Sequence, residues 1–181
     1  MTNPFARLHD LSRFFFAATA ADLREAYEGL AASGLTLPPV SDWAEAAFCF
    51  NRLFVGPKAL AAPPYATVYL DGDATRLMGA STARIRQLYD MLGLASPWEN
   101  KIPDDHIAFE LDALWQISQT LQSVVSPQLK DAQAYLHEHL RAWVPAFVER
   151  IRAAPDPHPA IVAVANALLK SVETTDAVGA Y

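Results

Sequence analysis

The segment from Pro103 to Glu110 concentrates the side chains of this 181-residue chain that are most able to do chemistry. Asp104, Asp105 and His106 are consecutive, and Glu110 lies one helical turn after the histidine. Carboxylates accept a guanidinium in bidentate geometry, so the segment fits a site for a basic partner. The alternative is structural, because acids at a helix N-terminus are stabilising by ~0.3–1 kcal/mol each. Proton transfer by His106 is conceivable, but no nucleophile or second acid/base group accompanies it.

Other motifs that resemble catalytic or metal sites each lack a required residue. Gly56-Pro57-Lys58 has neither the glycine spacing nor the Ser/Thr of a phosphate-binding loop. Ser81 lacks the second glycine and the preceding strand of a nucleophile elbow, so we expect it to be a helix N-cap. His137 and His139 are two residues apart on a predicted helix and point about 200° apart, which prevents shared metal binding. We therefore expect no catalytic residue, no metal and no cofactor.

A second segment, residues 50–71, combines aromatic residues with prolines. It starts on an apolar helix, and Pro63-Pro64 then imposes an extended, polyproline-like path. A compact domain rarely keeps so long a loop without a use for it. Its candidate contact residues offer apolar or amphipathic side chains: Leu53, Phe54, Tyr65 and Tyr69. The segment is either a recognition surface or a lid over the core.

Helical periodicity dominates the chain and predicts an all-α fold, a single-domain helical bundle. The Pro- and aromatic-rich loop Val55–Gly79 separates the third and fourth helices. Within it, Thr67–Leu70 has strand-like residues but no partner strand, so we expect extended loop there. The fifth helix begins near Pro103, with Asp104 and Asp105 in its first turn. The other expected helices cover Pro4–Ala17, Ala20–Ala32 after an N-cap at Thr19, Asp42–Phe54 with Asp42 and Glu45 as capping pair, Ser81–Leu92, a helix from Pro127 after Ser126 that reaches His139 and continues or kinks near Pro145, and Ala160–Val172.

Composition indicates a globular protein with an acidic surface. Hydrophobic residues make up 52% and charged residues 19%, enough for a buried core. The net charge of −6 argues against a nucleic-acid partner. The single cysteine, Cys49, excludes an internal disulfide and fits a core thiol. The apolar run Phe14–Ala21 is shorter than a membrane span and lacks the flanks of a secretory signal. We expect one cytoplasmic domain over residues 1–181, with a frayed end after residue 174.

Three stretches together resemble one family. Leu53-Phe-Val-Gly-Pro57 is followed by Pro63-Pro-Tyr-Ala-Thr-Val-Tyr-Leu-Asp71 and, about thirty residues later, by the acidic segment 103–111. The ordered set is similar to the TorD/DmsD/NarJ family of redox-enzyme maturation proteins, closest to the TorD/DmsD branch, and His139-Leu-Arg-Ala-Trp143 resembles a later family segment. The resemblance covers roughly residues 5–172. It implies a cytoplasmic chaperone, not an enzyme, that binds the twin-arginine signal peptide and apo-form of a molybdopterin-dependent oxidoreductase of the dimethyl sulfoxide reductase type and assists cofactor insertion before export.

The resemblance also implies where a peptide would bind. The family's peptide-binding surface falls on Leu53, Phe54, Pro64, Tyr65, Asp105 and His106, and we extend the candidate site to Phe50, Tyr69, Asp104 and Glu110. Relatives have tryptophan where this chain has Phe50, Tyr65 and Tyr69, and an acid where it has Ile102. These departures bear on which peptide fits. The acidic wall lies beside the aromatic wall if the fifth helix packs near the third.

Two other functions stay open at this stage. One is nucleotide hydrolysis with His106 and the nearby acids as the site, since guanine nucleotide binding has been associated with some family members. The other is a purely structural helical subunit. The identity of the client reductase does not follow from the sequence. The resemblance allows a monomer or a domain-swapped dimer, with residues 94–103 or 155–159 as conceivable hinges.

Overall fold

The computed structural model describes residues 6–57, 59–72, 78–94 and 101–174. Across these residues the regular structure is helical apart from one isolated bridge, which confirms the all-α prediction. The predicted frayed tail and most of the proposed 94–103 hinge lie outside the described residues. The helices are α1 (Ala6–Phe15), α2 (Ala20–Ala32), α3 (Trp43–Phe54), α4 (Thr67–Leu70), α5 (Ala80–Leu92), α6 (Ile107–Thr120), α7 (Pro127–Ala153) and α8 (Pro159–Thr174).

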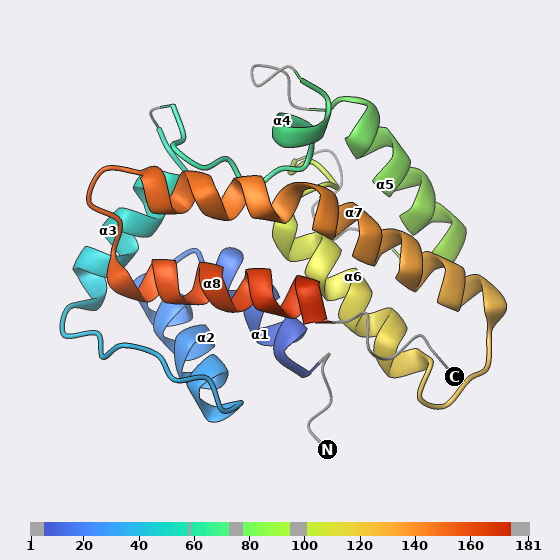
Figure 1. Ribbon diagram of the computed structural model, residues 1–181, viewed down its shortest axis with the longest axis horizontal. Helices are drawn as coiled ribbons and strands as arrows, with labels where there is room; N and C mark the ends of the chain where they lie inside the picture. The colour runs from blue at the N-terminus through green and yellow to red at the C-terminus, as the bar shows by residue number, and fades with distance from the viewer. Residues whose placement is uncertain (1–5, 58, 73–77, 95–100, 175–181) are drawn as a thin grey trace.

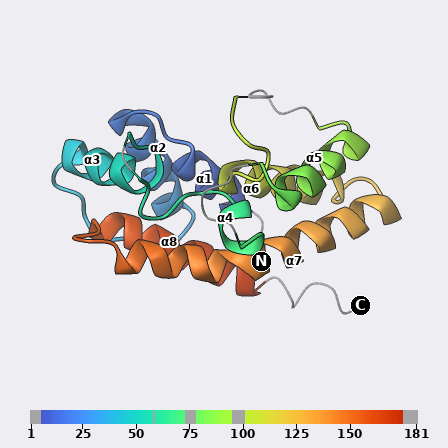
Figure 2. The ribbon, with the colours of Figure 1, turned by 90° about the horizontal axis from the view of Figure 1, so that it is seen from above.

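The helices form two layers around one core. Figure 1 shows α7 running along most of the molecule, with α8 beside it and α5 at the end remote from α2 and α3. Seen from above, α7 and α8 lie on one side and α1, α2, α3 and α6 on the other (Figure 2). The main packing pairs are α1 with α6, α7 with α8 and α1 with α2. The helix α5 packs mainly against α4.

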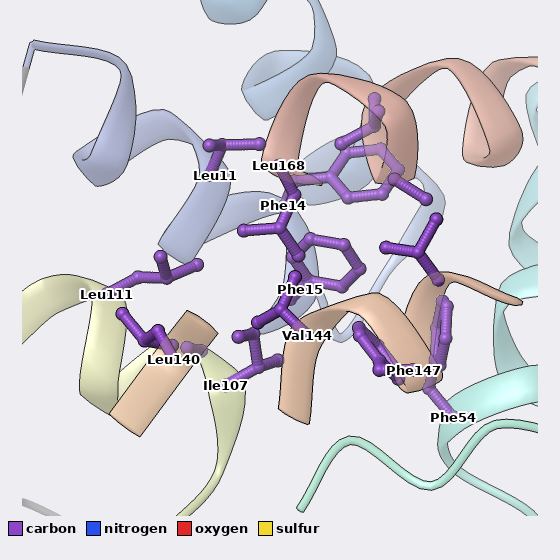
Figure 3. Close-up of a cluster of buried hydrophobic side chains, with 14 of the residues drawn as sticks. Leu11, Phe14, Phe15, Phe54, Ile107, Leu111, Leu140, Val144, Phe147 and Leu168 are labelled. Carbon is purple, nitrogen blue, oxygen red and sulfur yellow. The ribbon is translucent and has the colours of Figure 1, made fainter. Parts of the chain in front are cut away.

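The core lies where the two layers meet. Side chains from α1, α3, α6, α7 and α8 converge there (Figure 3). Phe147 and Leu168 are fully buried, and the Phe147 ring contacts those of Phe15 and Phe54 with centroids 5.6 and 5.8 Å apart. Burying such a side chain contributes ~1.5–3 kcal/mol. The core therefore fixes α7 against α1 and α3, and through them the loops that follow α3.

Helix starts follow the side chains that cap them. Thr19 caps α2 and Asp42 accepts the first N–H groups of α3, as the sequence predicted, and Asp22 completes a reciprocal capping box with Thr19 that was not predicted. Ser126 caps α7 in the same way, with Pro127 in its first turn. Capping by Thr19, Asp42 and Ser126 thus sets three of the helix boundaries.

Two predictions around α4 and α5 are wrong. Thr67–Leu70 is a short helix rather than extended loop. The N-cap of α5 is Gly79, not Ser81, whose N–H and hydroxyl both donate to Asp71, at 3.0 and 2.5 Å. A side chain at position 79 would meet the Asp71 carboxylate at 2.2 Å, so glycine lets Asp71 reach the start of α5. The capping carboxylate comes from the preceding loop, which local sequence does not reveal.

The helix α7 continues through Pro145 as one element, and its ribbon changes direction near the middle (Figure 1). Proline cannot donate to the carbonyl four residues earlier and usually bends a helix. Pro145 is exposed, while Trp143, Val144 and Phe147 are fully buried against the core. The buried face therefore holds the helix across the missing hydrogen bond.

Candidate functional site

The two motifs of the predicted site meet through their backbones. Tyr65 and His106 form an isolated antiparallel bridge. The Ile107 N–H donates to the Pro64 carbonyl at 2.9 Å, and the Ala66 N–H donates to the carbonyl before His106 at 3.1 Å. The loop after α3 is thereby joined to the segment that precedes α6. The acidic and aromatic segments are adjacent, as expected, although the contact is this bridge rather than packing of α6 on α3.

The start of α6 differs from the prediction. The helix begins at Ile107 with His106 as N-cap, so Asp104 and Asp105 precede it and do not lie in its first turn. The backbone there is used for the bridge to the loop at Pro64, which keeps it extended. The two aspartates are therefore available for contacts with α4 and α5.

Asp105 is fully buried and holds α4 and α5 in place. One carboxylate oxygen accepts the Thr67 N–H at the start of α4 at 2.8 Å, and the other accepts the Thr82 hydroxyl of α5 at 2.9 Å. The hydroxyls of Thr67 and Thr82 are 2.8 Å apart. The buried charge is thus matched by hydrogen bonds, as buried charges must be. Asp105 acts here as a structural joint.

Asp104 carries an ion pair at the edge of the same joint. Arg86 of α5 donates its Nε–H to the Asp104 carboxylate at 2.6 Å. The Asp104 side chain is 5% exposed and that of Arg86 40%. The carboxylate is therefore covered by a side chain that itself reaches solvent.

His106 is neutral at physiological pH. Burial lowers its pKa from 6.5 to about 3. Its Nδ1 accepts the Ala108 N–H at 3.2 Å, which places the proton of the neutral ring on Nε2. The ring therefore adds no positive charge beside the aspartates, and it caps α6.

Three aromatic side chains surround the His106 ring. Tyr65, Phe109 and Phe16 have ring centroids 5.1, 5.5 and 5.9 Å from it. All three are half-buried and so keep part of their surface in solvent. We call Phe16, Tyr65 and Phe109 the aromatic cup. Phe16 and Phe109 were not among the predicted site residues. Phe109 falls between the buried positions Ile107 and Leu111, a spacing that indicates a side chain off the core face.

Glu110 is fully buried between α6 and α7. Its Oε2 lies 2.9 Å from His139 Nδ1 and accepts the Trp143 indole N–H at 3.4 Å. Burial raises the pKa of Glu110. Burial is the largest single influence on His139 and lowers its pKa, but the hydrogen bond to Glu110 and the negative charges of Glu110 and Asp105 together raise the His139 pKa. Among the described residues, the second Glu110 oxygen and the buried Tyr89 hydroxyl have no hydrogen-bond partner.

The apolar members of the predicted site belong to the core in this structure. Phe50, Leu53 and Phe54 are 3%, 0% and 4% exposed. Figure 3 shows Phe54 directed toward Phe147 among the core side chains. Pro64 is also buried. These four residues shape the segment from beneath, and a ligand reaches them only if the segment opens.

Tyr69 lies on α4 and is half-buried against α7. It stacks on Trp143 at 5.5 Å, and its hydroxyl donates to the Pro63 carbonyl at 2.9 Å. The Arg150 guanidinium lies 5.0 Å from the ring centroid, a cation–π distance. Burial raises the pKa of the Tyr69 hydroxyl. Of the ten predicted residues, Tyr65 and Tyr69 are half-buried and the other eight are buried.

Neither a metal site nor a membrane-spanning helix is present within the described ranges. No group of three or more His, Cys, Asp or Glu side chains there could hold a metal ion. None of the helices in those ranges combines the length and the apolar character needed to cross a membrane. Cys49 is buried, as predicted, with its sulfur accepting the His158 N–H at 3.3 Å.

Comparison with known proteins agrees with the motif pattern. The family model described as nitrate reductase delta subunit matches residues 16–149. The chain is 35% identical over 104 residues to the chaperone protein TorD of Aliivibrio salmonicida, covering 54% of this chain and 47% of the relative. It is 32% identical over 101 residues to the Tat proofreading chaperone DmsD of Salmonella typhi, covering 55% and 46%. The chain thus spans about half the length of these curated relatives.

A solved structure shares the fold. It is the crystal structure of an Archaeoglobus fulgidus protein assigned to redox enzyme maturation, with a TM-score of 0.70, 21% identity and coverage of 96% of both chains. The curated relatives are named as chaperones, not as enzymes. The family match covers most of the chain and includes both motifs of the candidate site. The chain therefore belongs to the nitrate reductase delta subunit family, the TorD/DmsD/NarJ group of redox-enzyme maturation proteins.

Proposed function

We propose that this protein is a cytoplasmic chaperone that binds the twin-arginine signal peptide and apo-form of a molybdopterin-dependent oxidoreductase of the dimethyl sulfoxide reductase type. Binding would assist cofactor insertion and precede export. The names of the curated relatives, TorD and the Tat proofreading chaperone DmsD, support this assignment.

The observation that carries the proposal is the junction of the two motifs. The bridge between Tyr65 and His106 joins the loop after α3 to the segment before α6, and the aromatic cup surrounds His106, which follows Asp104 by two residues in the sequence. A twin-arginine signal has a basic start and a moderately apolar continuation. Carboxylates suit the first part and an aromatic surface suits the second. The junction offers both within a few residues.

The structure changes which predicted residues we expect to touch the peptide. Tyr65 and Asp104 are the members of the two motifs that can meet a ligand with the smallest rearrangement. Asp105 and Glu110 are enclosed by their own hydrogen bonds. We expect direct contacts from the first pair and support from the second.

Calorimetry with signal peptides from candidate reductases tests the proposal. Tyr65→Ala should weaken binding about tenfold, since an aromatic side-chain contact contributes on the order of 0.5–1.5 kcal/mol beyond the apolar area that it buries. The matched control is Phe48→Ala, which removes an aromatic ring that is 71% exposed on α3, outside the cup. The control should bind as the wild type does. Failure of the intact protein to bind any such peptide or apo-enzyme would overturn the proposal.

Co-purification from cells addresses the partner directly. The bound protein should be an apo-reductase carrying a twin-arginine leader, and loss of its leader should reduce recovery.

Size-exclusion chromatography tests the predicted monomer or swapped dimer. Within one chain, Arg52 of α3 donates to the carbonyls of Pro155 and Asp156 at 2.5 and 2.9 Å. These hydrogen bonds join the connection between α7 and α8 to α3 of the same chain.

A further inference from the structure

The carboxylate best placed to receive a peptide arginine already holds a guanidinium. Arg86 donates its Nε–H to Asp104 at 2.6 Å, and the Asp104 side chain is 5% exposed. The occupant is thus of the same chemical class as the ligand that the proposed function requires. An incoming cation has to displace Arg86 to take over the contact with this Asp104 oxygen.

The three acidic side chains of the motif differ in how easily their partners can be exchanged. Asp105 is held by the Thr67 backbone and the Thr82 hydroxyl, both buried, so exchange there would open α4 and α5. Glu110 is enclosed by α7. The partner of Asp104 is a long side chain that is 40% exposed, and it is the most accessible of these partners. Exchange is therefore least costly at Asp104.

We propose that Arg86 is a specificity-determining residue that occupies Asp104 in the free protein and is displaced by an arginine of the bound peptide. The inference rests on the proposed function and adds a requirement to it. A planar guanidinium can replace another with similar hydrogen bonds, so exchange for arginine is nearly balanced. An ammonium is a strongly hydrated point charge that does not reproduce the fork. Arg86 thereby disfavours lysine peptides, as repulsive or competing elements do in specific interfaces.

Arg84 provides a matched control on the same helix. It lies two residues before Arg86, is exposed, and points to another side of α5. Arg84→Gln and Arg86→Gln make the same change in net charge. Any effect of long-range attraction for a basic peptide is therefore common to both variants, and the difference between them reports the contact with Asp104.

The test is calorimetry of the wild type and both variants with two peptides, one with the twin arginines and one with lysines in their place. We expect Arg86→Gln to bind the twin-arginine peptide about two- to fivefold more tightly than Arg84→Gln does, the range of a partly exposed ion pair. The gain in affinity of Arg86→Gln for the twin-lysine peptide should be larger than its gain for the twin-arginine peptide. The variant should therefore prefer arginine over lysine by a smaller factor than the wild type does. Equal or weaker binding of the twin-arginine peptide by Arg86→Gln would overturn the inference while leaving the proposed function intact.

A second measurement covers the case in which Arg86→Gln does not fold. The Nε–H resonance of Arg86 in the ¹⁵N-labelled wild type should shift and exchange faster with water when the twin-arginine peptide is added. An unchanged resonance in the presence of bound peptide would overturn the inference. Absence of peptide binding by the wild type and by both variants would instead refute the proposed function, and the inference with it.

Discussion

The burial of His106 predicts a loss of stability in mild acid that one substitution should remove. Burial lowers the pKa of the ring from 6.5 to about 3. Between these values the unfolded chain binds a proton that the native protein does not. The free energy of unfolding therefore falls as the pH drops below 6.5 and the contribution is present above it. Between pH 7 and pH 5, the linkage relation gives a loss of about 2 kcal/mol from His106 alone.

The assay is urea unfolding of the wild type and His106→Asn at pH 7 and pH 5, followed by circular dichroism. Asparagine is a favourable N-cap and does not titrate, so the cap of α6 is kept while the ionisation is lost. The other acids and histidines are common to both proteins and cancel in the comparison. The wild type should lose about 2 kcal/mol more than the variant over this interval. His158→Asn, the same change at the half-exposed start of α8, controls for the substitution itself.

A parallel pH dependence of the wild type and His106→Asn would refute this reasoning. It would mean that the ring gains a proton in the native protein as readily as in the unfolded chain. The aromatic cup would then be open enough to hydrate an imidazolium, and the charge balance beside Asp104 would change with pH. His106 would then be positively charged in mild acid, and it would compete with the basic residues of the peptide for the carboxylates of the site.

Three further substitutions test separate parts of the structure. Asp105→Ala should lower the free energy of unfolding by about 2–3 kcal/mol in urea titrations, because the buried Thr67 N–H loses its acceptor and the Thr82 hydroxyl loses one of its partners. Phe147→Ala, at a fully buried position, should cost about 3–5 kcal/mol in the same assay. The pKa of His139 is raised, so the native protein keeps a proton above pH 6.5 that the unfolded chain releases, and the melting temperature should fall from pH 6.5 to 8; His139→Gln should flatten that slope.

The sequence predicted the helices whose boundaries depend on neighbouring residues. Thr19 and Ser126 cap the helices they precede, and the apolar spacing of α8 gives its extent to within two residues. The prediction failed where a boundary depends on a distant residue. The short helix Thr67–Leu70 starts at a backbone N–H that Asp105 accepts from 38 positions away. Four residues with strand-like side chains give no local sign of that contact.

The start of α6 shows the same limit. A proline followed by two acids fits the first turn of a helix, and that pattern predicted a start near Pro103. The bridge between His106 and Tyr65 keeps this backbone extended, and the helix begins four residues later. A pairing between segments about forty residues apart is a tertiary contact, so it overrides the local preference without leaving a mark in either segment alone.

For the site, residue type did not distinguish a surface for a ligand from a surface for the core. Leu53 and Phe54 satisfy the apolar spacing of a groove wall, and the same spacing buries them against α1 and α7. Phe16 and Phe109 were not predicted because they do not follow the apolar spacing of the core face, and both are half-buried in the structure. The peptide-binding role of the ten predicted residues stays a prediction, now with different tasks for different members.

That division of tasks decides how mutations of the acidic motif must be interpreted. Loss of peptide binding in Asp105→Ala would be expected both from a direct contact and from displacement of α4 and α5, since the carboxylate joins the two. A loss of about 2–3 kcal/mol still leaves a protein of ordinary stability folded, so affinity can be measured at matched folded fractions. Asp104→Asn should reduce affinity with little change in the unfolding midpoint, because its partner is a half-exposed arginine. If Asp105→Ala reduces affinity at matched folded fractions and Asp104→Asn does not, the peptide arginine binds deeper than Asp104, and α5 has to move to admit it.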